Sequence, residues 1–151
     1  MNRREEAEGI VKLVLCDALA VDEEDITPDA RLGPDLGADS LDYLDIRLQL
    51  EQRTRAVISS EDNPFAQLAL YIAGSEHLRG GIYTEAGMER LHKEMKPFYD
   101  GLTEDQRARL DDTREHAYFA QEVNVRGLIG YVESLLERRD EPRPAATVSS
   151  R

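Results

Sequence analysis

Ser40 is the residue whose position in the sequence best suits chemistry. It follows a turn that contains Gly37 and precedes an apolar run that begins at Leu41, so we expect it at the amino end of a helix. A serine there is exposed, lies near backbone N–H groups that no carbonyl of the helix uses, and meets a dipole that favours added negative charge. These properties suit a hydroxyl that is to carry a phosphate-linked group. The alternative is that Ser40, or Asp39 beside it, only caps the helix.

Two helices and a long loop must position this serine. Apolar spacing predicts a first helix over residues 5–20. A polar loop over residues 22–39 follows, and we expect three apolar residues to anchor it to a core: Ile26, Leu32 and Leu36. The second helix opens at Ser40 and ends near residues 53–55. Its expected core stripe is Leu41, Leu44 and Leu48, with Ile46 and Leu50 as a second apolar edge.

The chain from residue 61 to residue 121 has a different character. Start signals predict helices over residues 64–72, 84–98 and 103–119, the last with a capping box formed by Thr103 and Gln106. A final helix follows within residues 122–138, with Asn124 as its N-cap, and residues 139–151 are expected to be a disordered tail. Leaving the apolar side chains of residues 61–121 in water is costly, so we expect them to pack on the rest of the chain. The other options are that they pack on each other, or on a second copy of the chain, which would make a homodimer.

Composition limits the class of protein. The 151 residues carry a formal net charge of −12, which argues against nucleic acid and favours basic protein partners. Cys16 is the single cysteine and fits a small core residue better than a reactive thiol. The N-terminal residues do not resemble a signal peptide, and no apolar run approaches a membrane span. We therefore expect an all-α, cytoplasmic protein without membrane insertion.

The residues around Ser40 closely resemble a known family. The stretch Leu36-Gly37-Ala38-Asp39-Ser40-Leu41 is similar to the helix-opening motif of acyl carrier proteins, residue for residue. Further resemblance lies in two blocks, residues 10–59 and 123–136, which together make about half of the chain. The segment 61–121 replaces the short connection that the family has between its second and last helices, and it is too long for a bare loop.

This resemblance implies a fold and a function. The fold would be an acyl-carrier-like four-helix bundle elaborated by an inserted helical segment, with residues 1–60 and 122–138 as the bundle and 61–121 as the insertion. A phosphopantetheinyl transferase would attach 4′-phosphopantetheine from coenzyme A to Ser40, with Asp39 and Leu41 beside the arm. The arm would carry acyl groups as thioesters for a fatty-acid or polyketide-type pathway, and the chain itself would not be an enzyme. The bundle interior could shelter the acyl group.

The partners that the resemblance implies are acyl-loading, synthase and transferase enzymes with basic docking patches. Asp42, Asp45 and Glu51 resemble the acidic face to which such partners dock, although the helix dipole alone also favours carboxylates near a helix start. The sequence departs from the family at Arg47, Arg53 and Arg55, where apolar or acidic residues are usual, and this puts the usual set of partners in doubt. Tyr43 is expected either to pack in the core or to contact cargo or a partner.

Other functions are less well supported. Glu89 and His92 have the spacing of a di-iron motif, but such a site needs a second copy and two further glutamates, so we expect no metal. Ser40 lacks the Gly-x-Ser-x-Gly elbow of a hydrolase. The remaining alternatives are a helical adaptor that never receives the arm, and a peptidyl or aryl carrier.

Overall fold

The described chain is mostly helical, and the last helix packs against three of the others. The computed structural model describes residues 2–59, 63–69 and 76–141. The helices are α1 (Arg3–Leu19), the short 3₁₀ helix η1 (Glu23–Asp25), α2 (Ser40–Thr54), α3 (Pro64–Ala69), α4 (Glu85–Glu94), α5 (Lys96–Asp100), α6 (Glu104–Thr113), α7 (His116–Glu122) and α8 (Val125–Asp140). Two short antiparallel strands, β1 (Leu78–Arg79) and β2 (Ile82–Tyr83), form a hairpin. The expected all-α class is therefore confirmed.

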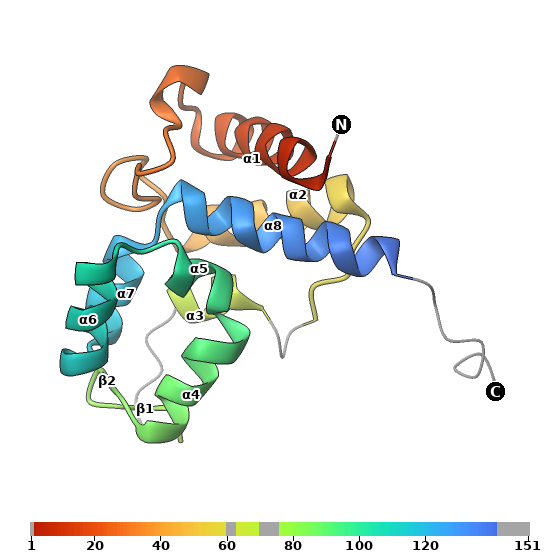
Figure 1. The fold of residues 1–151 in the computed structure, drawn as a ribbon. Helices are drawn as coiled ribbons and strands as arrows, with labels where there is room; N and C mark the ends of the chain where they lie inside the picture. Colours follow the sequence, from red (N-terminus) through yellow and green to blue (C-terminus); the bar gives the residue numbers. More distant parts are fainter. Residues whose placement is uncertain (1, 60–62, 70–75, 142–151) are drawn as a thin grey trace, which may run out of the picture.

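The last helix, α8, lies at the centre of the carrier-like part. It packs against α1, α2 and α5, and α1 also packs against α2 (Figure 1). The buried residues of α8 recur at helical spacing and include Leu128, Val132 and Leu135. Three loop anchors expected from the sequence, Ile26, Leu32 and Leu36, are all buried. None of the described helices is long and apolar enough to cross a membrane.

Capping residues fix most helix starts where the sequence predicts them. Thr84 accepts a hydrogen bond from the amide of Gly87, and Asn124 accepts one from the amide of Gly127. Thr103 and Gln106 form the expected capping box. The Asn63 side chain accepts from the amide of Phe65 at the start of α3.

Two predicted helices are each interrupted, which corrects the sequence-based expectation. The segment 84–98 divides at Met95 into α4 and α5. The segment 103–119 divides at Arg114, whose φ of 58° places it in the left-handed region, into α6 and α7. Both sides of each break carry buried apolar residues, Leu91 and Phe98 in the first case and Leu110 and Phe119 in the second. The part of the predicted helix 64–72 beyond residue 69, and the tail beyond residue 141, lie outside the described residues.

The insertion contributes to the same hydrophobic core as the bundle. Its buried side chains include those that we expected to pack, namely Leu68, Met88, Leu91, Met95, Phe98, Leu110 and Phe119. Ile72 lies outside the described residues. In Figure 1, α5 lies against α8, and α3 lies near α5. The division of the chain into domains and the homodimer both remain predictions.

Candidate functional site

Ser40 is the first residue of α2, and its side chain is exposed. The residue that caps the helix is Asp39, whose carboxylate accepts a hydrogen bond from the amide of Asp42 at 2.9 Å. The Asp42 carboxylate in turn accepts from the amide of Asp39 at 3.0 Å, which completes a capping box. The helix start therefore does not depend on the Ser40 hydroxyl as its cap.

The turn before Ser40 depends on a glycine. Gly37 has a φ of 81°, a backbone conformation that residues with a Cβ rarely adopt. Its amide donates to the carbonyl of Gly33 at 2.8 Å, and the amide of Ala38 donates to the carbonyl of Leu32 at 2.9 Å. The chain is thus turned into α2 with Ser40 at the outer end of the helix.

Hydrogen bonds join the preceding loop to the start of α8. The amide of Leu32 donates to the carbonyl of Val123 at 3.1 Å, and the amide of Val125 donates to the carbonyl of Ala30 at 3.0 Å. These bonds fix the loop that leads to Ser40 relative to the central helix.

An ion pair between Arg31 and Asp35 stabilises the same loop. The Asp35 carboxylate accepts from the backbone amide of Arg31 at 2.8 Å and from its guanidinium at 3.2 Å. These bonds, first the one from the backbone, hold the pKa of Asp35 below its usual range. The guanidinium also reaches Glu122, which directly precedes the connection to α8, at 3.4 Å.

The core stripe predicted for α2 is wrong. Leu41, Leu44 and Leu48 are 75%, 52% and 55% exposed, whereas Tyr43, Ile46 and Leu50 are buried. The sequence carries two apolar faces on this helix, and periodicity alone does not tell which of them meets α1, α3 and α8. The exposed leucines form a row along α2 that begins beside Ser40, and we call it the leucine row. Only their exposure, which the sequence does not give, distinguishes them from core residues.

Tyr43 is a core residue rather than a surface residue beside the arm. It is buried, and its ring stacks on that of Phe65 with 6.3 Å between the ring centroids. Burial, with a contribution from the nearby Asp42 carboxylate, raises the pKa of Tyr43 to about 12. Phe65 lies in the helix predicted over residues 64–72, but its sequence position carries no signal that distinguishes it from other apolar residues.

The three carboxylates predicted for docking have different surroundings. Asp42 is occupied by the capping box. Asp45 is exposed and lies 3.3 Å from the side-chain nitrogen of Gln49. Glu51 accepts a hydrogen bond from the amide of Ile58 at 2.9 Å, and only a quarter of its side chain is exposed. Asp45 is therefore the carboxylate of this set most available to a partner.

Comparisons with known proteins agree with this geometry. Residues 10–62, which include Ser40, match the family model described as a phosphopantetheine attachment site. An acyl carrier protein of Thermotoga maritima is 39% identical over 62 residues, which are 41% of this chain and 76% of the relative. An acyl carrier protein of Solidesulfovibrio magneticus is 42% identical over 52 residues, 34% of this chain and 67% of the relative. No solved structure gave a significant match.

The chain belongs to the acyl carrier protein family. The family and the matched attachment-site model show that its cofactor is a covalently bound 4′-phosphopantetheine. The start of α2 fits this group chemically. It offers an exposed serine residue, a cap supplied by another residue, and a helix dipole that favours the negative charge of a phosphodiester.

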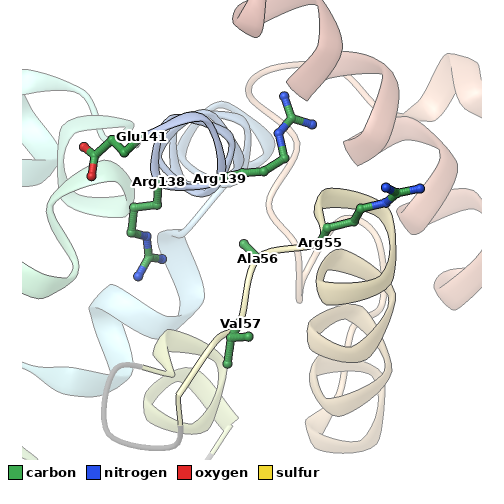
Figure 2. A pocket seen from close by; sticks show the side chains of 6 residues that line it. All are labelled: Arg55, Ala56, Val57, Arg138, Arg139 and Glu141. Carbon is green, nitrogen blue, oxygen red and sulfur yellow. The ribbon is translucent and has the colours of Figure 1, made fainter. Parts of the chain in front are cut away.

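A hollow at the C-terminal end of α2 is separate from the proposed attachment site at Ser40. It has a volume of 340 Å³ and lies between the ends of α2 and α8. Figure 2 shows that the side chains of Arg55, Arg138 and Arg139 point in different directions, so they do not converge on one ligand. The length of α2, about 22 Å at 1.5 Å per residue, separates the hollow from Ser40.

The candidate metal-binding residues pair with other groups. The Glu89 carboxylate pairs with Lys93 at 3.1 Å, and the His92 ring lies 3.2 Å from Asp111. Among residues 2–59, 63–69 and 76–141, no group of three or more His, Cys, Asp or Glu side chains is placed to hold a metal ion.

Proposed function

We propose that Ser40 carries the 4′-phosphopantetheine arm and that the chain delivers acyl groups as thioesters in a specialised fatty-acid or polyketide-type pathway. The observation that carries this proposal is that Ser40 is an exposed residue at the first position of α2, with Asp39 as the cap. The chain itself has no catalytic role in this proposal.

The Ser40 oxygen acts as the nucleophile when the arm is attached. It bonds to the phosphorus that coenzyme A carries on its pantetheine side, and the bond from that phosphorus to the bridging oxygen breaks. Adenosine 3′,5′-bisphosphate leaves, and the hydroxyl proton passes to a base of the transferase. The start of α2 then stabilises the phosphodiester, because helix dipoles favour anions at their amino ends. When bound, the arm supplies a thiol that holds an acyl group as a thioester.

Partner enzymes dock, in this proposal, on the exposed face of α2. The leucine row offers apolar contact beside the arm, and Asp45 supplies negative charge next to it. A net charge of −12 steers a basic surface toward this face. Asp42 contributes charge as well as its capping bonds, whereas the Glu51 carboxylate is directed to the backbone of Ile58.

The experiment that tests the function is intact mass after incubation with a phosphopantetheinyl transferase and coenzyme A. The wild type should gain the mass of one phosphopantetheine, and Ser40→Ala should gain none. Ser59→Ala is the matched control, because Ser59 is an exposed serine outside the site, and it should gain the same mass as the wild type. Modification of Ser40→Ala, or an unmodified wild type, would contradict the proposal.

A further inference from the structure

Four aromatic rings fill the interior of the bundle close to Ser40. They are Tyr43 of α2, Phe65 of α3, Phe98 of α5 and Tyr131 of α8, which we call the aromatic cluster, and none is more than 6% exposed. Tyr43 lies three residues after Ser40, which is about 4.5 Å along the helix axis. The cluster therefore begins within one turn of the proposed attachment point.

Phe65 is the centre of the cluster. Its ring centroid lies 6.3 Å from that of Tyr43, 6.2 Å from that of Phe98 and 5.6 Å from that of Tyr131. Phe98 and Tyr131 are themselves 5.4 Å apart. These are the separations of packed aromatic pairs, so the rings occupy the space between α2 and α8. Both phenylalanines come from the insertion.

The chain that leads to Phe65 is held by two side chains of α2. The Arg47 guanidinium donates to the carbonyl of Ile58 at 2.8 Å, and the Glu51 carboxylate accepts from the amide of the same residue at 2.9 Å. Ile58 is buried, and the Asn63 side chain then fixes the start of α3 through the amide of Phe65. Arg47, one of the departures from the family pattern, thus helps to direct the insertion into the bundle.

The chain that carries Phe98 approaches α8 more closely than side chains would allow. A Cβ added to Gly101 would lie 2.7 Å from the Cα of Gly127, and one added to Gly127 would lie 3.0 Å from the Cα of Phe98. Asn124 also donates from its side chain to the carbonyl of Gly101 at 3.0 Å. Backbones in such contact leave little freedom for Phe98 to move aside.

We infer that the aromatic cluster determines cargo specificity by excluding a long acyl chain from the bundle interior. This inference rests on the proposed function of Ser40. The transfer of an alkyl chain from water to an apolar interior is favourable, and the interior that begins at Tyr43 lies within one helical turn of the attachment point. Since four rings occupy that space, an acyl chain enters only by displacing one of them. The chain is therefore suited to short or polar acyl groups, or to cargo that stays outside the bundle.

The test compares acyl groups of different length on the same protein. The transferase loads acetyl- or octanoyl-phosphopantetheine onto the full chain from the corresponding acyl-coenzyme A, and intact mass verifies loading. Melting temperature and the rate of thioester cleavage by hydroxylamine are then measured. For the wild type we expect the same melting temperature and the same cleavage rate with both groups.

In the Phe65→Ala variant, the space that the ring occupied should admit an acyl chain to the bundle interior. The octanoyl form of this variant should melt above its acetyl form by about 4 °C, and its octanoyl thioester should be cleaved several-fold more slowly. Phe65→Leu should show the same trend to a smaller extent, and it provides the test if the alanine variant does not fold. Phe119→Ala, which truncates a buried phenylalanine outside the cluster, should show no dependence on chain length.

Two outcomes would overturn the inference. One is a wild-type octanoyl form that is stabilised or protected relative to its acetyl form. The other is that at least one Phe65 variant folds, and that neither its melting temperature nor its thioester cleavage rate depends on the length of the acyl chain. A wild type that gains no mass would overturn the proposed function, and the inference with it, and the mass measurement identifies this case separately.

Discussion

At the scale of single residues, the sequence allows either Asp39 or Ser40 to cap α2, and the structure assigns the cap to Asp39. The Asp39 carboxylate forms the capping box with Asp42, and Ser40 is an exposed residue at the first position of the helix. We expect Asp39→Ala to lower the free energy of unfolding by about 1 kcal/mol. Ser40→Ala should change it by less than about 0.5 kcal/mol, because Ser40 is exposed and alanine has a high helix propensity. Urea unfolding measures both, and equal losses would show that Ser40 is a cap.

A second pair of residues makes the stability of the insertion depend on pH. The Tyr83 hydroxyl and the Nδ1 atom of His116 are 2.7 Å apart in a buried contact between β2 and α7. Burial lowers the pKa of His116 below its ordinary value. The neutral ring is therefore the form that the folded protein favours.

The sign of the pH dependence follows from this shift. The unfolded chain binds a proton at His116 at a higher pH than the folded chain does, so stability is complete above about pH 6.5 and falls as the pH decreases below it. We expect the loss from this group to be less than about 1.4 kcal/mol per pH unit, the limit for one proton. Urea unfolding at pH 7.5 and 5.5 measures it. The loss should be smaller in His116→Gln, and an equal loss there would assign the effect to other groups.

At the scale of elements, glycines control how closely α5 approaches α8. We expect Gly101→Ala to lower the free energy of unfolding by roughly 1–3 kcal/mol, because the added methyl meets the backbone of Gly127 at 2.7 Å. Gly9→Ala is the matched control, since Gly9 lies in α1 and a Cβ there meets nothing within 4 Å. That change should stabilise the protein by roughly 0.5–1 kcal/mol. A neutral Gly101→Ala would show that the two helices are not packed this closely.

The exposed position of Asp45 on α2 predicts how its charge affects the rate of acyl transfer to partner enzymes. Asp45→Lys should slow acyl transfer to a partner with a basic docking patch several-fold at low salt, and added salt should reduce the difference. Asp45 is preferable to Asp42 for this test, because reversing Asp42 also removes the capping box. Glu24→Lys changes the net charge equally at an exposed residue of η1, and it should have little effect. Equal effects of both changes would indicate a general charge effect and no docking by Asp45.

The starts of several helices were predictable from the sequence because a capping side chain forms a local hydrogen bond there. Thr84, Thr103 and Asn124 all cap the helices that were expected to follow them. The break at Met95 had a sequence signal in Pro97, which is tolerated in the first turn of α5 but not in a helix interior. The break at Arg114 had no such signal, because its left-handed backbone conformation is one that usually favours glycine. The β1–β2 hairpin has a local sequence signal in the pair Gly80-Gly81, whose φ values of 58° and 81° suit a tight turn.

The choice of the buried face of α2 could not be predicted from that helix alone. Both Leu44 and Ile46 are suited to a core, and only Ile46 is buried. The helices that α2 packs against, α1, α3 and α8, are all separated from it in the sequence by ten or more residues. The attachment serine, in contrast, is carried by a short motif, so it could be proposed before the fold was known.

At the scale of the whole molecule, the bundle and the described parts of the insertion share one hydrophobic core. We therefore expect a single unfolding transition in urea, with coincident curves from circular dichroism and from tyrosine fluorescence. Replacing residues 61–121 by a short polar linker should destabilise the remainder, because Phe65 and Phe98 pack directly on Tyr131 of α8. Two separate transitions, or an unaffected remainder, would show that the insertion folds independently.

The central claim is that Ser40 bears the arm, and peptide mapping of the chain purified from its own cells tests it most directly. Cleavage after Arg31 and Arg47 yields the peptide 32–47, in which Ser40 is the single serine and no threonine occurs. We predict that this peptide carries the mass of one phosphopantetheine and that fragmentation locates it on Ser40. An unmodified peptide 32–47, or an arm found on another peptide, would contradict the account.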